Sequence, residues 1–170
     1  MRHFRFFFLL VFAAALLNAC SVRFNFSGGG AVNPDIKSIA IQPFSMDAAL
    51  APPYTGQFFS TKLQERFLNQ SRLYLTDNNP SIELSGSISD YSIMPIAIQG
   101  NTSAAQNRLT LKIHVSYKNN VVPNESWEKD FSQVEDFDAS RDLASIEREK
   151  IEAITARLTQ DIFNESLGKW

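Results

Sequence analysis

Apolar and polar residues alternate most regularly between residues 108 and 118. The side chains of a β-strand point alternately to its two faces, so this pattern predicts a strand with one buried face and one solvated face. Strands of this kind are typical of antiparallel sheets that face water on one side. The expected buried face consists of Leu109, Leu111, Ile113, Val115 and Tyr117.

Shorter apolar stretches predict four further strands. Their expected ranges are residues 36–44, 73–76, 82–88 and 126–134. After Ile88 the apolar positions move from even to odd numbers, and near Pro95 they move back. Because one inserted residue changes the face of every later side chain, we expect a bulge or bend near Ser89-Asp90 and another near Pro95. The expected loops are residues 45–53, 99–107 and 119–124.

Two other segments have apolar residues spaced three or four positions apart, which is the spacing of one helix face. The first helix is expected over residues 55–70 and the second over 141–167, with Ser140 as N-cap and Gly168 just past its end. The apolar face of the first consists of Phe59, Leu63 and Phe67. That of the second consists of Ile151, Ile154, Leu158 and Ile162.

Together these elements predict an α+β fold. Two helices that pack on one face of a mostly antiparallel sheet of about four strands would bury both helix stripes and the apolar strand face. The other face of the sheet would stay free. We therefore expect a two-layer sandwich, formed by a single domain over residues 36–170.

The first nineteen residues have the layout of a bacterial secretory signal. Arg2 and Arg5 precede an apolar run over residues 6–16, which is shorter than the ~20 residues of a membrane span. The next four residues, Leu17-Asn18-Ala19-Cys20, resemble a lipobox. A lipobox is the site where a lipoprotein signal is cut in front of a cysteine that carries acyl chains such as palmitate.

We therefore expect residues 1–19 to be removed and Cys20 to be the lipid anchor. Residues 20–35 would be a flexible tether, because they contain three consecutive glycines and a proline. The chain has no other cysteine, which favours this role. The alternative is a plain signal peptide followed by an unmodified cysteine.

Charge and composition exclude several classes of function. The formal net charge is −2, and removal of Arg2 and Arg5 with the signal makes it about −4, which argues against nucleic-acid binding. Cys20 is the single cysteine and His114 the single histidine after the signal, so we expect no disulfide and no cysteine- or histidine-based metal site. No serine has the Gly-x-Ser-x-Gly context of a nucleophile elbow. We expect no enzyme, no cofactor and no metal.

An acidic segment, Glu135-Asp136-Phe137-Asp138, follows the last predicted strand. It lacks the spaced oxygen ligands and the glycine of a calcium loop. We interpret it as a solvated loop, with a cation site as the alternative.

The solvated face of the strand over residues 108–118 carries the candidate binding residues Arg108, Lys112 and Lys118, together with His114. Cations at alternate positions are suited to a phosphorylated ligand. The alternative is that wet sheet faces carry Lys and Arg because these residues prevent aggregation.

Several stretches of the chain, in their order and spacing, resemble a known family. They are residues 26–28, 34–39, 63–67, 72–80, 88–92, 104–110, 131–137 and 161–164. Through them, nearly all of the chain after the signal is similar to the LptE family of lipopolysaccharide-assembly outer-membrane lipoproteins, in the form found in Bacteroidetes.

The resemblance implies a fold of two helices on a four-stranded sheet. It also implies an outer-membrane lipoprotein on the periplasmic side or within the lumen of an LptD-type β-barrel. Such a protein would plug the barrel, help it assemble and aid lipopolysaccharide insertion into the outer leaflet. The residue that transfers from the family is the acylated Cys20; Arg108, Lys112 and Lys118 rest on alternation alone.

Two other functions stay open. One is a lipoprotein pilot or adaptor of another envelope secretion complex. The other is a free-standing periplasmic lipoprotein that binds glycolipid.

Overall fold

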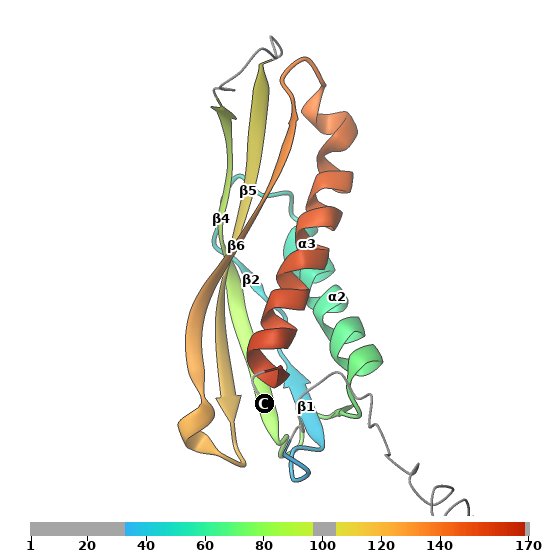
Figure 1. Cartoon of the computed structure of the whole chain (residues 1–170), viewed down its shortest axis with the longest axis vertical. Helices are drawn as coiled ribbons and strands as arrows, with labels where there is room; N and C mark the ends of the chain where they lie inside the picture. The colour runs from blue at the N-terminus through green and yellow to red at the C-terminus, as the bar shows by residue number, and fades with distance from the viewer. Residues whose placement is uncertain (1–32, 97–104, 169–170) are drawn as a thin grey trace, which may run out of the picture.

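A computed structural model describes residues 33–96 and 105–168 of the chain. The expected signal, Cys20 and most of the expected tether lie outside these residues, as does most of the loop expected over 99–107. Figure 1 shows an elongated molecule in which the longest strands and the longest helix run along the same axis.

The strands form one mixed sheet in the order β3-β1-β4-β5-β6, and β2 lies beside β4. Their ranges are β1 Ser38–Ile41, β2 Ser45–Met46, β3 Tyr74–Leu75, β4 Ile82–Ile96, β5 Gln106–Asn119 and β6 Trp127–Asp138. The long strands β4, β5 and β6 are antiparallel neighbours, whereas β1 runs parallel to both β3 and β4. A parallel pair needs a crossover connection, and a helix lies between β1 and β3 in the chain.

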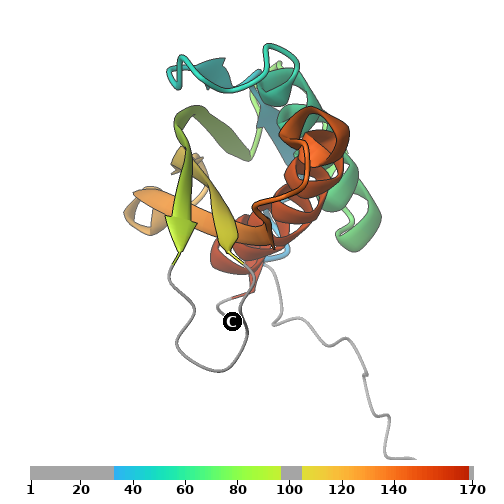
Figure 2. The same cartoon turned by 90° about the horizontal axis from the view of Figure 1, so that it is seen from above.

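The two helices are α2, Thr55–Gln70, and α3, Leu143–Leu167. Seen end-on in Figure 2, both lie on the same side of the long strands. A short 3-10 helix, Pro123–Glu125, connects β5 to β6. The predicted α+β sandwich with both helices on one face of the sheet is confirmed.

The core lies between the helices and the sheet, and it uses the residues that periodicity predicts. The predicted apolar face of β5 is buried along its whole length, with exposures of 0–2% from Leu109 to Tyr117. The apolar stripes of both helices are equally inaccessible to solvent. These buried helix residues are Phe59, Leu63, Phe67, Ile151, Ile154, Leu158 and Ile162.

The sheet has six strands where about four were expected. The additional pairing comes from very short strands, because β2 and β3 have two residues each. β2 lies in the segment expected as the loop 45–53 and pairs with β4 through Ser45↔Ser87 and Met46↔Ile88. The strand expected over residues 73–76 is β3, so only β2 was missed, because its two residues are too few to show a periodic pattern.

The bulge predicted near Ser89-Asp90 is confirmed, because the pairing of β4 with β5 shifts its register between Ile88 and Asp90. The second bulge, predicted near Pro95, is wrong, because the pairing continues without a shift to Pro95↔Asn107 and Ile96↔Gln106. Among residues 33–96 and 105–168, β1 and β2 pair with β4 only as far as Ile88, and no described strand pairs with its other edge beside Pro95. A proline is tolerated at such an edge because its missing N–H can face solvent.

The acidic segment 135–138 belongs to β6, which corrects the expected loop. Its side chains alternate between the two faces of the sheet, so they do not converge on one cation. The expected N-cap Ser140 is also wrong. Asp142 caps α3, and its side chain accepts a hydrogen bond from the Ala144 N–H at 3.3 Å. Gly168 lies at the C-cap, as predicted.

Candidate functional site

The candidate site is the outer face of the sheet, which is the face turned away from α2 and α3. The register of β4, β5 and β6 places Arg108, Lys112, His114 and Lys118 on this face, as alternation predicts. Along each row of the sheet, side chains of β4 and β6 flank those of β5. The pairing therefore decides which groups surround each predicted cation.

A carboxylate accompanies every one of these basic residues. The Arg108 guanidinium donates two hydrogen bonds to Asp136, at 2.7 and 2.8 Å. Lys112 Nζ lies 2.7 Å from one oxygen of Asp130, and His114 Nδ1 lies 2.8 Å from the other. An acidic residue of β6 therefore lies beside Arg108, Lys112 and His114.

On the other side of β5, Lys118 Nζ lies 3.2 Å from Glu83 of β4. The same Glu83 oxygen accepts a hydrogen bond from Asn120 Nδ2 at 2.7 Å. The side chains in all these ion pairs are 35–62% exposed. Exposed pairs contribute little to stability, so their charges remain available to a ligand.

The contacts lower the pKa values of the carboxyl groups. Hydrogen bonds from Lys112 and then His114 lower the pKa of Asp130, and the hydrogen bonds from Arg108 lower the pKa of Asp136. The pKa of Glu83 is lowered first by the Asn120 amide and then by Lys118. Each carboxylate is therefore charged at neutral pH, when it balances its cation.

The outer face as a whole is more acidic than β5 alone indicates. Six carboxylates of β4 and β6 lie on it, against three lysines and arginines of β5. These carboxylates are Glu83, Asp90, Glu128, Asp130, Asp136 and Asp138. The acidic residues were visible in the sequence, but their position on this face follows from the register of the strands.

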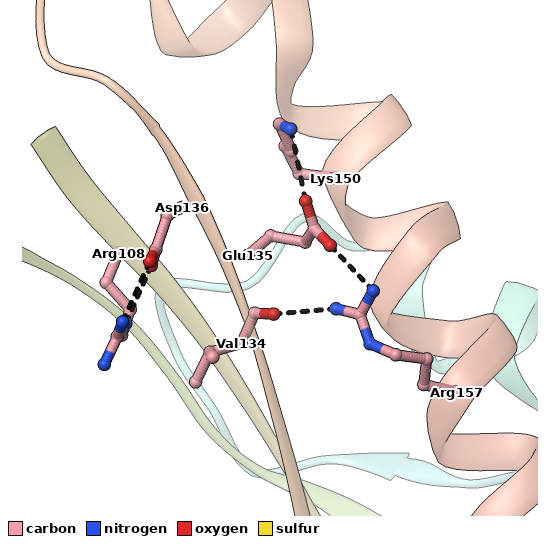
Figure 3. A network of polar contacts seen from close by, with 6 residues as sticks. All are labelled: Arg108, Val134, Glu135, Asp136, Lys150 and Arg157. Atoms are coloured by element: carbon pink, nitrogen blue, oxygen red, sulfur yellow. Dashed lines mark hydrogen bonds and ion pairs between the residues drawn. The ribbon is translucent and has the colours of Figure 1, made fainter.

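The opposite side of β6 holds α3 through a second polar network, drawn in Figure 3. Glu135 accepts hydrogen bonds from Arg157 at 2.7 Å and Lys150 at 3.2 Å, both from α3. Arg157 also donates to the Val134 carbonyl at 2.7 Å. Asp136 points to the other face, toward Arg108. Glu135 therefore connects the sheet to α3, whereas its neighbour Asp136 pairs with Arg108 on the outer face.

Replacing Glu135 by glutamine is expected to cost about 1–2 kcal/mol of unfolding free energy at neutral pH, because two charged donors lose the carboxylate charge they share and one of its two acceptor oxygens. Burial alone would raise the pKa of Glu135, but the hydrogen bonds from Arg157 and Lys150 outweigh it and the pKa lies below its usual 4.5. The stabilisation is therefore present above pH 4.5 and lost as the pH falls through the lowered value.

Urea unfolding of the wild-type protein and of Glu135→Gln, from neutral pH to below pH 4.5, measures the difference in unfolding free energy. This difference should become smaller as the pH falls. Glu149→Gln is the control, since Glu149 is an exposed residue of α3, the helix that carries Lys150 and Arg157, and has no ion pair among the described residues. An equal cost for both substitutions would contradict the network's role.

A groove of about 470 Å³ lies between α2 and α3. Arg66 of α2 lines it and donates to Thr159 Oγ1, Gln160 Oε1 and the Ala156 carbonyl, all of α3. These acceptors are neutral, and the contacts hold the two helices together. We assign this arrangement a structural task.

Two further properties bear on function. Within residues 33–96 and 105–168, no three acidic, histidine or cysteine side chains are grouped as metal ligands. In the same residues, neither helix combines the length and apolar character needed to cross a bilayer.

Comparison with solved structures shows what the fold resembles. A minor lipoprotein from Acinetobacter baumannii is similar with a TM-score of 0.52 and 12% identity, over 77% of this chain and 92% of that one. A protein from Xanthomonas campestris gives a TM-score of 0.51 and 10% identity, over 80% and 89%. At such identities the likeness concerns the fold alone. A search of curated proteins finds no match.

The comparison with protein families is more specific. The model of the LptE family, described as lipopolysaccharide-assembly, matches residues 36–166. The match covers the entire sheet, α2 and all but the last residue of α3, and so it includes the outer face and its ion pairs. The chain therefore belongs to the LptE family of lipopolysaccharide-assembly proteins.

Proposed function

We propose that this protein is the lipid-anchored LptE component of a lipopolysaccharide translocon at the outer membrane. It plugs an LptD-type β-barrel, helps the barrel assemble and aids insertion of lipopolysaccharide into the outer leaflet. The observation that carries the proposal is the family match over residues 36–166. In this proposal residues 1–19 are the signal, Cys20 is the anchor and residues 36–170 are one non-enzymatic domain.

The outer face of the sheet suits this task physically. The lumen of a large outer-membrane barrel is polar, so a plug needs a polar surface. The exposed ion pairs supply charges of both signs at spacings fixed by the strands. Because each pair is exposed, wall residues or lipid phosphates can replace one partner at little cost.

Arg108 has the geometry best suited to a lipopolysaccharide phosphate. Its guanidinium binds Asp136 through two parallel hydrogen bonds, which is also how arginine binds phosphate. Lys112 and Lys118 would add point charges on the same face. A phosphate at Arg108 must displace Asp136, so we expect the carboxylate to weaken binding.

Asp136→Asn is therefore expected to strengthen binding of purified lipopolysaccharide several-fold, because it frees the guanidinium, whereas Arg108→Gln should weaken binding. Fluorescence titration of the purified proteins measures both effects. Asp138→Asn is the matched control, because it removes the same charge from the same strand without releasing Arg108; the Asp138 carboxylate accepts from the Ser140 N–H instead. Equal gains from Asp136→Asn and Asp138→Asn would mean that net charge alone matters.

The proposed association with a β-barrel is tested by photo-crosslinking in cells. A photo-reactive residue at Ser132, which is exposed on β6 and faces outward opposite Lys112, is expected to crosslink to a large outer-membrane β-barrel. The same variant carrying Cys20→Ser is the control and should lose the product. A crosslink to a different secretion complex would favour the pilot or adaptor function. A crosslink to glycolipid alone would favour a free-standing carrier.

A further inference from the structure

Exposed apolar side chains gather at one end of the domain. The described residues include seven large apolar side chains with high exposure, and four belong to this end. These are Leu68 at 41%, Tyr74 at 60%, Leu75 at 41% and Val121 at 37% exposure. They come from the last turn of α2, from β3 and from the connection between β5 and β6. We call this the tether end, because the described chain begins there.

Backbone and side-chain contacts show that these segments lie together. Tyr74 N–H donates to the Lys37 carbonyl at 3.2 Å, which places β3 beside the start of β1. Ser38 and Ser81 share a side-chain hydrogen bond of 3.2 Å, and Asn120 N–H donates to the Ser81 carbonyl at 2.9 Å. The chain entry, β3 and the β5–β6 connection therefore form one continuous end of the molecule.

Two basic residues at this end, Lys37 and Arg72, form no ion pair among the described residues, unlike most of the other described lysines and arginines. Seven of the twelve described lysines and arginines form ion pairs with carboxylates. Lys37 and Arg72, by contrast, are exposed and have no side-chain hydrogen bond or ion pair among the described residues. Asp35 and Asp77 are close in sequence, so the local charge balances. The combination of exposed Tyr and Leu with unpaired cations is typical of a surface that meets lipid headgroups.

The position of the expected lipid anchor, Cys20, also places the tether end close to a membrane. Cys20 lies thirteen residues before Asn33, where the described chain begins, so the two are at most about 45 Å apart. β4 starts beside β1, and its fifteen residues carry the sheet about 50 Å away from this end. A lipid on Cys20 therefore confines the tether end to within about 45 Å of the leaflet, whereas the far end of the sheet can lie up to about 50 Å farther out.

We propose that the tether end is a membrane-contact site for phospholipid. Before the protein joins its barrel, the domain rests on the leaflet that holds the Cys20 lipid. Tyr74, Leu75 and Val121 enter the headgroup region, while Lys37 and Arg72 contact phosphates. The inference rests on the lipid anchor of the proposed function. It would fix the domain upright, with the outer face of the sheet accessible to a barrel.

The test uses the lipidated full-length mature protein in vesicles of phosphatidylethanolamine and phosphatidylglycerol. Because the lipid consumes the Cys20 thiol, a second cysteine can carry a polarity-sensitive fluorophore. Val121→Cys and Tyr74→Cys place the probe at the tether end, and the first of these leaves the tyrosine intact. Ser132→Cys places it on the outer face of the sheet as a control. Spin-labelled lipids then serve as quenchers.

Quenching several-fold stronger at both tether-end positions than at Ser132 is the expected result. Equal quenching at all three positions, with the protein still floating with the vesicles, would overturn the contact and leave the proposed function untouched. Failure to float would refute the Cys20 anchor itself. Strong quenching combined with no barrel crosslink in cells would support the contact and refute the translocon role alone.

Discussion

Replacing Cys20 by serine is expected to move the protein from the membrane fraction to the soluble periplasm. A serine hydroxyl cannot carry the thioether-linked lipid, and because the lipoprotein peptidase requires the cysteine, the variant is made behind a signal that an ordinary signal peptidase cuts. Each buried methylene of an acyl chain contributes roughly 0.8 kcal/mol, so the loss of several chains removes nearly all of the membrane affinity. Cell fractionation measures the change, and mass spectrometry of the N-terminal peptide reports the lipid directly.

Ser21→Ala is the matched control, because it changes the next residue and leaves the lipobox intact. It should stay in the membrane fraction. If Cys20→Ser also stays there without a lipid, the alternative of a plain signal peptide with an unmodified cysteine would be favoured, and a protein partner would hold the chain at the membrane.

Replacing Phe59 by alanine is expected to cost about 3–5 kcal/mol of unfolding free energy. Phe59 of α2 is 0% exposed, and its ring packs edge-on against Phe44 with centroids 4.9 Å apart. Truncation removes the apolar contacts and leaves a cavity between the helix layer and the sheet. Urea unfolding followed by circular dichroism measures the loss. Domains of this size have total stabilities of about 5–15 kcal/mol, so the variant should be partly unfolded at elevated temperature.

Phe58→Ala provides a control within the same helix. The Phe58 side chain is half-buried and lines the groove between α2 and α3, so its removal leaves little enclosed space. We expect a clearly smaller loss of stability. Equal losses at Phe58 and Phe59 would mean that the core does not lie between the helices and the sheet.

Local patterns predicted the elements well where a long run repeats one geometry. The helix expected over residues 55–70 is α2, and the strand expected over 108–118 lies within β5. In both, every repeat adds evidence for the same face, so the signal grows with length. The shift of parity after Ile88 also located the bulge of β4. The two-residue strand β2 offered too little length for this kind of evidence, whereas β3 lies within the strand expected over residues 73–76.

The requirement for a glycine at position 86 is an example of a constraint that local sequence patterns do not reveal. In sequence it is an ordinary member of an alternating strand. In the fold, a Cβ atom at this position would lie 2.0 Å from the His114 carbonyl oxygen and 2.7 Å from the Phe44 ring. Both neighbours are distant along the chain, so only the packed structure explains why a glycine is needed.

The sequence by itself determined the two faces of β5 and the stripes of both helices, because each depends on residues a few positions apart. It also placed Arg108, Lys112 and Lys118 on one face. Only the tertiary structure decided that carboxylates accompany all three. Asp136 is 28 positions from Arg108 and Glu83 is 35 from Lys118. Such pairs meet because of strand order and register, which are set by the packing of the whole sheet against its helices.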